Sequence, residues 1–129
     1  MKDKKHTLGK AGEQHCITHL TQNGYNIVNQ NYRSRYGEID IIAIYKHFLV
    51  FIEVKTRTNE PLDHILSAIT YSKQKKITKT ALHFIQDYQN SDILEYRFDV
   101  MILQKDEDDF TVHHYENAFL PAEVGDFFA

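Results

Sequence analysis

Two stretches of nearly continuous apolar residues stand out along the chain, residues 38–45 and 48–57. Both are rich in Ile, Val and Phe and are mostly apolar on both faces, which is typical of strands at the centre of a sheet. Three further segments have strand patterns, namely residues 25–33, 95–103 and 111–117. The pattern therefore predicts five strands, of which the two apolar ones lie at the centre.

Helical spacing of apolar residues marks the segments around these strands. Residues 8–23 are predicted to form a helix, and Gly24 stands where a helix ends. Residues 62–89 are predicted to be mainly helical, with Thr70 as the cap of a second helix inside this stretch. The order α-β-β-β-α-β-β predicts an α/β fold, with a central mixed β-sheet flanked by helices.

The length and composition fit a soluble chain of about one domain. With 129 residues and 42% hydrophobic content, we expect a single domain over residues 1–129, with its core at about 8–103. No run of about 18 apolar residues predicts a membrane span, and no apolar stretch follows the basic N-terminal residues as a secretory signal requires. The only cysteine is Cys16, which suits a reducing compartment, so the expected location is the cytoplasm.

The charges are divided unevenly, although the net charge is only −3. Residues 1–105 hold all 15 lysines and arginines and 11 of the 18 acids, whereas residues 106–129 hold the other 7 acids. The body is thus mildly basic and the C-terminal segment acidic, which permits phosphate binding by the body. From Phe119 onward we expect a short helix, with Phe127 and Phe128 packed down.

The two central strands bring two carboxylates together if they pair as a hairpin. With a two-residue turn at Lys46 and His47, Asp40 faces Glu53, and their Cβ atoms lie about 4.5–5.5 Å apart. Like charges in this position destabilise a sheet, and a divalent cation bound by both carboxylates compensates for this. The turn has no glycine or asparagine, and a three-residue loop would shift the register by one.

The residue types at this hairpin fit phosphodiester cleavage. Glu53, Lys55 and Arg57 alternate with period two and so share a face. A cation on Asp40 and Glu53, with Mg²⁺ or Mn²⁺ as the expected cofactor, polarises a phosphoryl oxygen and lowers the pKa of bound water. The Lys55 ammonium can position that water or stabilise the developing charge. For any one of these residues the alternative is a solvated strand face.

These two motifs resemble the PD-(D/E)xK, or restriction-endonuclease-like, nuclease superfamily. Residues 37–43 (GEIDIIA) and 51–57 (FIEVKTR) are most similar to the bacterial YraN-like family. Further matches to that family are Gly12-Glu13, Gly24-Tyr25, Asn31-Tyr32-Arg33, Lys73-Gln74, Lys76-Ile77 and Arg97-Phe98-Asp99-Val100. The resemblance spans about residues 8–103. It departs from the superfamily pattern at Ile39, which stands where a proline is usual.

The resemblance implies a metal-dependent nuclease that acts on DNA. Its layout is similar to that of archaeal Holliday junction resolvases, which points to branched or structured DNA as substrate. It implies that Asp40 and Glu53 are metal ligands and that Lys55 is the catalytic lysine. It also implies that Glu13 is a helix acid that helps to hold the metal or water, and that Gln74 is an auxiliary residue near the site.

Six residues are candidates for contacts with nucleic acid: Arg33, Arg35, Arg57, Lys73, Gln74 and Lys76. A solvated surface is the alternative for each of them. Tyr32, Tyr36 and Tyr71 are candidates either for stacking on bases or for ordinary packing. No membrane partner is expected. Cutting both strands of a duplex needs two sites, which a homodimer provides.

The expected function is therefore a magnesium-dependent endonuclease that acts on DNA. The alternative is a nucleic-acid-binding protein that keeps the nuclease fold but cleaves little or not at all. A third reading is an interaction module recruited through its acidic segment. His15 and His19 have a spacing that can bind zinc, but the sequence offers no cysteine pair and no third ligand.

Overall fold

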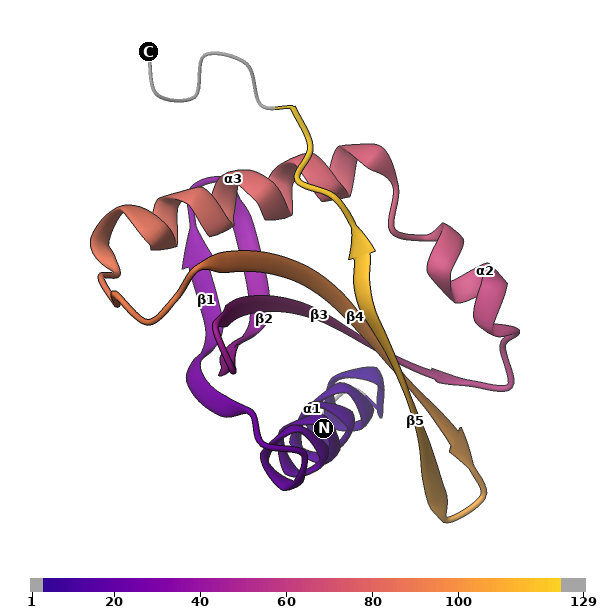
Figure 1. The fold of residues 1–129 in the computed structure, drawn as a ribbon. Coiled ribbons are helices and arrows are strands. Elements are labelled where there is room, and N and C mark those ends of the chain that lie inside the picture. Colours follow the sequence, from indigo (N-terminus) through magenta and orange to yellow (C-terminus); the bar gives the residue numbers. More distant parts are fainter. Residues whose placement is uncertain (1–3, 124–129) are drawn as a thin grey trace.

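The computed structural model describes residues 4–123, and the backbone alone for residues 4–7 (Figure 1). Its elements in chain order are α1 (Lys4–Gln22), β1 (Asn26–Ser34), β2 (Gly37–Tyr45), β3 (Phe48–Thr58), α2 (Leu62–Ser67), α3 (Tyr71–Asp87), β4 (Glu95–Asp106) and β5 (Asp109–Phe119). This confirms the predicted α/β class and element order, with the expected helical stretch divided into α2 and α3.

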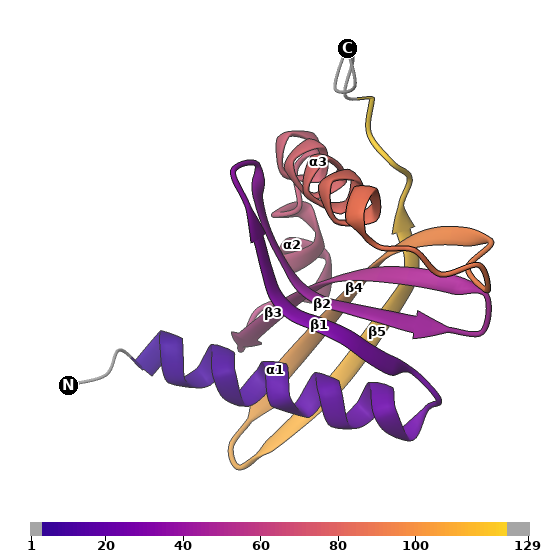
Figure 2. The ribbon, with the colours of Figure 1, turned by 90° about the vertical axis from the view of Figure 1, so that its left-hand side faces the viewer.

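The five strands form one mixed sheet in the order β1-β2-β3-β4-β5. Consecutive strands pair antiparallel except for β3 and β4, which run parallel. A parallel pair needs a crossover, and α2 and α3 supply it. The helices divide between the two faces: α1 lies across one face, and α2 and α3 lie on the other (Figures 1 and 2).

Strand β3 is central and is buried on both faces, as its apolar sequence predicts. Val50 and Ile52 pack in the cluster under α1, whereas Leu49 and Phe51 pack in the cluster under α3. The same alternation continues into the polar half of the strand. It therefore directs Glu53 and Lys55 away from α1.

The hairpin register follows the sequence prediction from Tyr45–Phe48 to Ile41–Ile52, but the predicted pair Asp40–Glu53 is not part of the ladder, because the two strands separate there. Tyr45 pairs with Phe48 across a two-residue turn, and Lys46 adopts φ of 54°, a left-handed conformation that a non-glycine residue rarely takes. The ladder between β2 and β3 runs only as far as the pair Ile41–Ile52. Beyond that pair, β2 stays paired with β1, and the β1–β2 hairpin bends toward α3 (Figure 2).

The change of direction in β2 is visible in its packing. Ile39 and Ile42 lie in the same cluster under α3, although strict alternation would place them on opposite faces. Ile41 lies in the cluster under α1. The alternation therefore breaks at Asp40, where the strand leaves β3.

Two terminal predictions are corrected. The first helix begins at Lys4 rather than at residue 8. The expected helix from Phe119 is wrong over residues 120–123, which have no regular structure. Phe119 pairs with Phe98 and stacks on its ring with centroids 5.1 Å apart, which keeps this part of the chain extended in β5. Phe127 and Phe128 lie outside the described residues.

A buried charged network ties β4 to the end of β5. The Arg97 guanidinium donates to both carboxylate oxygens of Asp99, at 2.9 and 2.7 Å, and to the Tyr25 hydroxyl at 2.6 Å. His114 and the backbone N–H of Asn117 also contact the Asp99 carboxylate. Asp99 is fully buried, so its charge depends on these partners.

We predict that Arg97→Leu lowers the free energy of unfolding by about 3–5 kcal/mol, because it leaves the buried Asp99 carboxylate without its cationic partner. Urea denaturation measures the loss. Arg33→Leu is the control, because Arg33 and its partner Glu38 are exposed, and an exposed pair contributes at most about 1 kcal/mol. Equal losses in the two variants would contradict the prediction.

Candidate functional site

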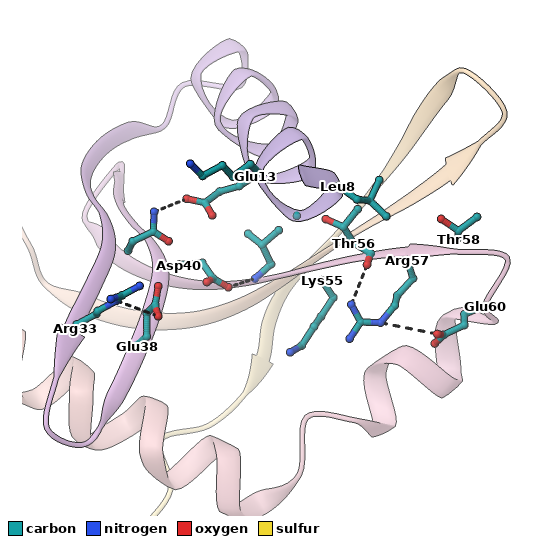
Figure 3. Close-up of a pocket in the computed structure, with 14 residues that line it drawn as sticks. Leu8, Glu13, Arg33, Glu38, Asp40, Lys55, Thr56, Arg57, Thr58 and Glu60 are labelled. Carbon is teal, nitrogen blue, oxygen red and sulfur yellow. Dashed lines mark hydrogen bonds and ion pairs between the residues drawn. The ribbon is translucent and has the colours of Figure 1, made fainter. Parts of the chain in front are cut away.

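Asp40 sits at the point where β2 stops pairing with β3. Its Oδ2 accepts a hydrogen bond of 2.8 Å from the backbone N–H of Val54. The side chain thus serves a backbone group of β3 just past the last ladder pair, Ile41–Ile52. The carboxylate is held at the split between the two strands, and Figure 3 shows it directed toward β3.

Glu53 and Lys55 form an ion pair on β3. The Lys55 Nζ lies 3.1 Å from Glu53 Oε1, and both side chains are mostly buried, at 15% and 18% exposure. The pair follows from the alternation on the strand, since residues two apart share a face. A lysine that neutralises only one oxygen leaves the other Glu53 oxygen available to a cation.

Glu13 approaches the same region from α1. Its Oε1 accepts a hydrogen bond of 3.0 Å from Nδ2 of Asn31. Asn31 interrupts the β1–β2 ladder opposite Asp40 and has φ of 54°. Asparagine tolerates this left-handed conformation better than most residues. Two signals in the sequence point to Asn31, namely the Asn31-Tyr32-Arg33 match to the YraN-like family and an asparagine inside a strand pattern, and neither predicted a role for it.

The charges at the split repel one another. Burial raises the pKa of Asp40 to about 7, and the nearby Glu53 charge adds to this effect. The hydrogen bond from Val54 acts in the opposite direction, while the charges of Glu13 and Glu38 raise the pKa further. The pKa of Glu13 is also raised, chiefly by burial. This excess of negative charge favours binding of a cation.

A cleft of about 800 Å³ opens between α1, the β1–β2 hairpin and the end of β3 (Figure 3). Its lining is Leu8, Gly9, Lys10, Glu13, Asn31, Arg33, Glu38, Asp40, Val54, Lys55, Thr56, Arg57, Thr58 and Glu60. The structure therefore brings Glu13, Asp40 and Lys55 to one cleft. Glu53 is outside the lining, but it pairs with Lys55 and its charge adds to the raised pKa of Asp40.

The donor set fits magnesium better than zinc. Within residues 8–123 no group of three or more His, Cys, Asp or Glu side chains is arranged to hold a metal ion. A pair of carboxylates is still available in Asp40 and Glu53, and Mg²⁺ is commonly bound by one or two carboxylates with water and substrate phosphates completing the shell. His15 instead packs on Phe110, with ring centroids 4.4 Å apart.

The candidate nucleic-acid residues fall in different places. Arg33 and Arg57 line the cleft, where Arg33 pairs with Glu38 at 3.3 Å. The Arg57 guanidinium is tied to its own strand, because Nη1 donates to the Thr56 carbonyl at 2.8 Å. Arg35 lies in the turn between β1 and β2.

Gln74, which the family resemblance places near the acidic site, does not line the cleft. Lys73, Gln74 and Lys76 are on the first turns of α3. The Gln74 side-chain amide donates to the Ile69 carbonyl at 3.2 Å, and Gln74 lines a second, mostly apolar pocket beside Phe119. The Ile69 carbonyl lies at the break between α2 and α3, and it holds the Gln74 side chain there.

Tyr32 has a packing role. Its hydroxyl lies 2.6 Å from Nδ1 of His83, and its ring packs edge-on against Phe84 at 5.1 Å. Tyr71 is 58% exposed at the start of α3. Of the tyrosines proposed for stacking, Tyr71 thus keeps an accessible ring, and Tyr36 lies at the tip of the β1–β2 hairpin.

Close packing of α1 on β3 depends on Gly12. A Cβ on Gly12 would collide with Oγ1 of Thr56 and lie 3.0 Å from the Thr56 Cβ. The Thr56 hydroxyl is buried with no hydrogen-bond partner among the described residues. Glycine at this position therefore lets α1 approach close enough to place Glu13 over the cleft.

The match to a protein family covers most of the cleft lining. The model of the uncharacterised protein family UPF0102 matches residues 12–103, from Gly12 to the middle of β4. The chain belongs to the UPF0102 family. This membership agrees with the YraN-like resemblance of its motifs. Glu13, Asp40, Glu53 and Lys55 all lie within the matched range.

Other family members match over most of their length. A UPF0102 protein of Chlorobium phaeobacteroides (strain BS1) is 39% identical over 121 residues, which are 89% of this chain and 95% of the relative. A UPF0102 protein of Sulfurihydrogenibium sp. (strain YO3AOP1) is 42% identical over 111 residues, or 86% and 92% of the two chains. In this family member, none of the helices within the described range is long and apolar enough to cross a membrane.

We predict that Gly12→Ala lowers the free energy of unfolding by about 1–3 kcal/mol, because the added methyl group overpacks the contact with Thr56. Gly9→Ala is the matched control on the same helix, since its Cβ would meet nothing within 4 Å. There alanine should stabilise the helix by about 0.5–1 kcal/mol. Thermal denaturation of both variants measures the effects, and the same sign in both would contradict this packing.

We predict that ionisation of Asp40 destabilises the metal-free fold. The folded pKa of about 7 lies above the ~4 of an unfolded chain, so the folded state binds the proton more tightly. This contribution is fully present below pH ~4 and is lost as the pH rises through 7. The stability of the wild type relative to Asp40→Asn should therefore fall between pH 5 and pH 8 in EDTA.

Urea denaturation at the two pH values measures this difference, in which the other titrating groups largely cancel. A difference that does not change, or that rises with pH, would contradict the assigned environment of Asp40.

Proposed function

We propose that this UPF0102 protein is a metal-dependent endonuclease of the PD-(D/E)xK type that hydrolyses phosphodiester bonds in DNA. The observation that carries this proposal is the placement of Asp40. Its carboxylate is fixed by the N–H of Val54, the residue after Glu53, and burial together with the charge of Glu53 raises its pKa. Asp40 lines an open cleft and is repelled by the Glu53 carboxylate, which is a cost to the fold that a bound cation offsets.

Asp40 and Glu53 would hold a Mg²⁺ or Mn²⁺ ion. The ion would supply a Lewis acid for the phosphoryl oxygen and lower the pKa of a bound water. Val54 fixes the orientation of the Asp40 carboxylate, so little reorganisation is needed when the charge at the site changes. Asn31 holds the Glu13 carboxylate on the opposite side of the cleft, where it can accept a proton or orient water.

Lys55 pairs with Glu53 and lines the cleft. Held by Glu53 in the absence of substrate, its ammonium can turn to the negative charge that develops on the scissile phosphate. Arg33 and Arg57 line the same cleft, and we expect them to contact phosphates of the bound substrate. Branched or structured DNA remains a prediction from the family resemblance. A homodimer remains a prediction from the need for two sites to cut both strands, and a cytoplasmic location remains a prediction from the sequence.

We predict that Asp40→Asn and Glu53→Gln each lower the rate of Mg²⁺-dependent cleavage of DNA by about 100-fold or more, because the metal supplies several kcal/mol of transition-state stabilisation. Linear, nicked and branched duplexes of one sequence are the substrates. Asp108→Asn, an exposed carboxylate in the β4–β5 turn, is the control and should cleave as the wild type does.

Metal binding is measured separately from activity. Mg²⁺ at about 100 times its Kd should stabilise the wild type by roughly 2.7 kcal/mol and should stabilise Asp40→Asn much less. Equal cleavage by Asp40→Asn would refute the site. A wild type that retards DNA in a gel but does not cut it with Mg²⁺ or Mn²⁺ would establish the binding-protein alternative in place of the nuclease.

A further inference from the structure

The tip of the β1–β2 hairpin is packed on α3. The Ser34 hydroxyl lies 3.4 Å from the Thr80 hydroxyl. Gly37 sits so close that a Cβ there would lie 3.4 Å from the Thr80 hydroxyl oxygen and 3.7 Å from the Lys76 Cβ. The hairpin tip and the middle of α3 therefore form one continuous surface, with a fixed relation between their side chains.

On this surface Tyr36 holds two cations. The Arg35 Nη2 donates a 2.7 Å hydrogen bond to the Tyr36 hydroxyl, and the guanidinium carbon lies 4.9 Å from the ring centroid. The Lys79 ammonium lies 6.0 Å from the same centroid. At these distances the ring attracts both charges, so a cation from the hairpin and one from α3 are held together.

Helix α3 is basic in its N-terminal half. It carries Lys73, Lys75, Lys76 and Lys79, and its single acidic residue is Asp87, at the C-terminal end. Lys76 follows Lys73 by one turn and lies beside the hairpin tip, while Lys79 reaches Tyr36. The positive charge is therefore concentrated on the part of α3 that contacts the hairpin.

Arg33 connects this surface to the cleft. It precedes Ser34 at the end of β1, its side chain is 77% exposed, and it lines the cleft that contains Asp40. Arg33, Arg35, Tyr36, Lys76 and Lys79 are named here the hairpin–α3 strip. The strip begins on α3, crosses the hairpin tip and ends at the carboxylates.

The groups on the strip suit phosphates rather than bases. Guanidinium and ammonium groups contact the backbone of a nucleic acid without reading its sequence. Proteins that bind single strands add aromatic rings on which bases stack. The ring of Tyr36 is occupied with Arg35 and Lys79, so it acts as a support for cations.

We propose that the hairpin–α3 strip binds the phosphate backbone of double-stranded DNA, independently of sequence, and directs the duplex into the cleft. This rests on the proposed function and names its substrate class. Bases in a duplex already stack on one another, so a surface that contributes only cations favours a duplex over a single strand. Tyr36 and Lys79 thereby gain a role in positioning substrate, one as the support and the other as a phosphate ligand.

The test is the salt dependence of binding, measured by fluorescence anisotropy in EDTA with a labelled blunt duplex, the matching single strand and an RNA duplex of the same sequence. Each phosphate contact contributes about 0.9 to the slope of log K against log salt concentration for B-DNA. Lys79→Ala and Arg35→Ala should each reduce the magnitude of this negative slope by about that amount. The double variant should reduce it by about twice as much.

Lys46→Ala is the matched control. Lys46 also lies over a tyrosine, with its ammonium 5.2 Å from the Tyr45 centroid, but it stands in the β2–β3 turn rather than on the strip. It removes the same charge and should leave the slope unchanged. Circular dichroism melts of the two single strip variants, the double variant and Lys46→Ala establish that each is folded.

Tighter binding of the DNA duplex, with a slope that depends on the strip and not on Lys46, is the expected result. An unchanged slope in the strip variants, an equal fall in Lys46→Ala, or tighter binding of the single strand or the RNA duplex would overturn the inference. If the wild type cleaves DNA while the strip variants bind unchanged, the inference fails alone. If binding depends on the strip and no cleavage occurs, the proposed function fails alone.

Discussion

The hydrogen bond from the Val54 N–H to the Asp40 carboxylate fixes the geometry on which the site depends. It lies directly beyond the last ladder pair of β2 and β3, Ile41–Ile52. Where the strands separate, the Asp40 side chain therefore accepts a hydrogen bond from the β3 backbone in place of a backbone carbonyl of β2. The separation lets the β1–β2 hairpin bend toward α3 and opens the cleft. One contact thus links the shape of the sheet, the position of a carboxylate and the access of substrate.

The other side of the cleft is held by packing rather than by pairing. Gly12 allows α1 to lie close to Thr56, and the helix carries Glu13 toward the same region. Asn31 completes the arrangement, because its left-handed backbone interrupts the ladder opposite Asp40 and its amide holds Glu13. Rigid elements on both sides therefore hold Glu13 and Asp40 at the same cleft.

Sequence alone predicted what depends on local pattern. The continuous apolar runs indicated the central strands, and a two-residue turn at Lys46 gave the register that leads from Tyr45–Phe48 toward Asp40. The sequence could not show where β2 leaves β3, because alternation assumes a strand paired along its full length. It also could not show that Gln74 turns to the Ile69 carbonyl, since the break between α2 and α3 decides that contact.

The central claim is that Asp40 and Glu53 together hold a divalent metal ion at this split between the strands. The most direct measurement is a crystal structure of the protein soaked in Mn²⁺, with anomalous diffraction data to locate the metal. The account predicts one strong peak bridging the two carboxylates, lost in Asp40→Asn crystals soaked in the same way. A site left without a peak at saturating Mn²⁺, or a peak that persists in Asp40→Asn, would contradict it.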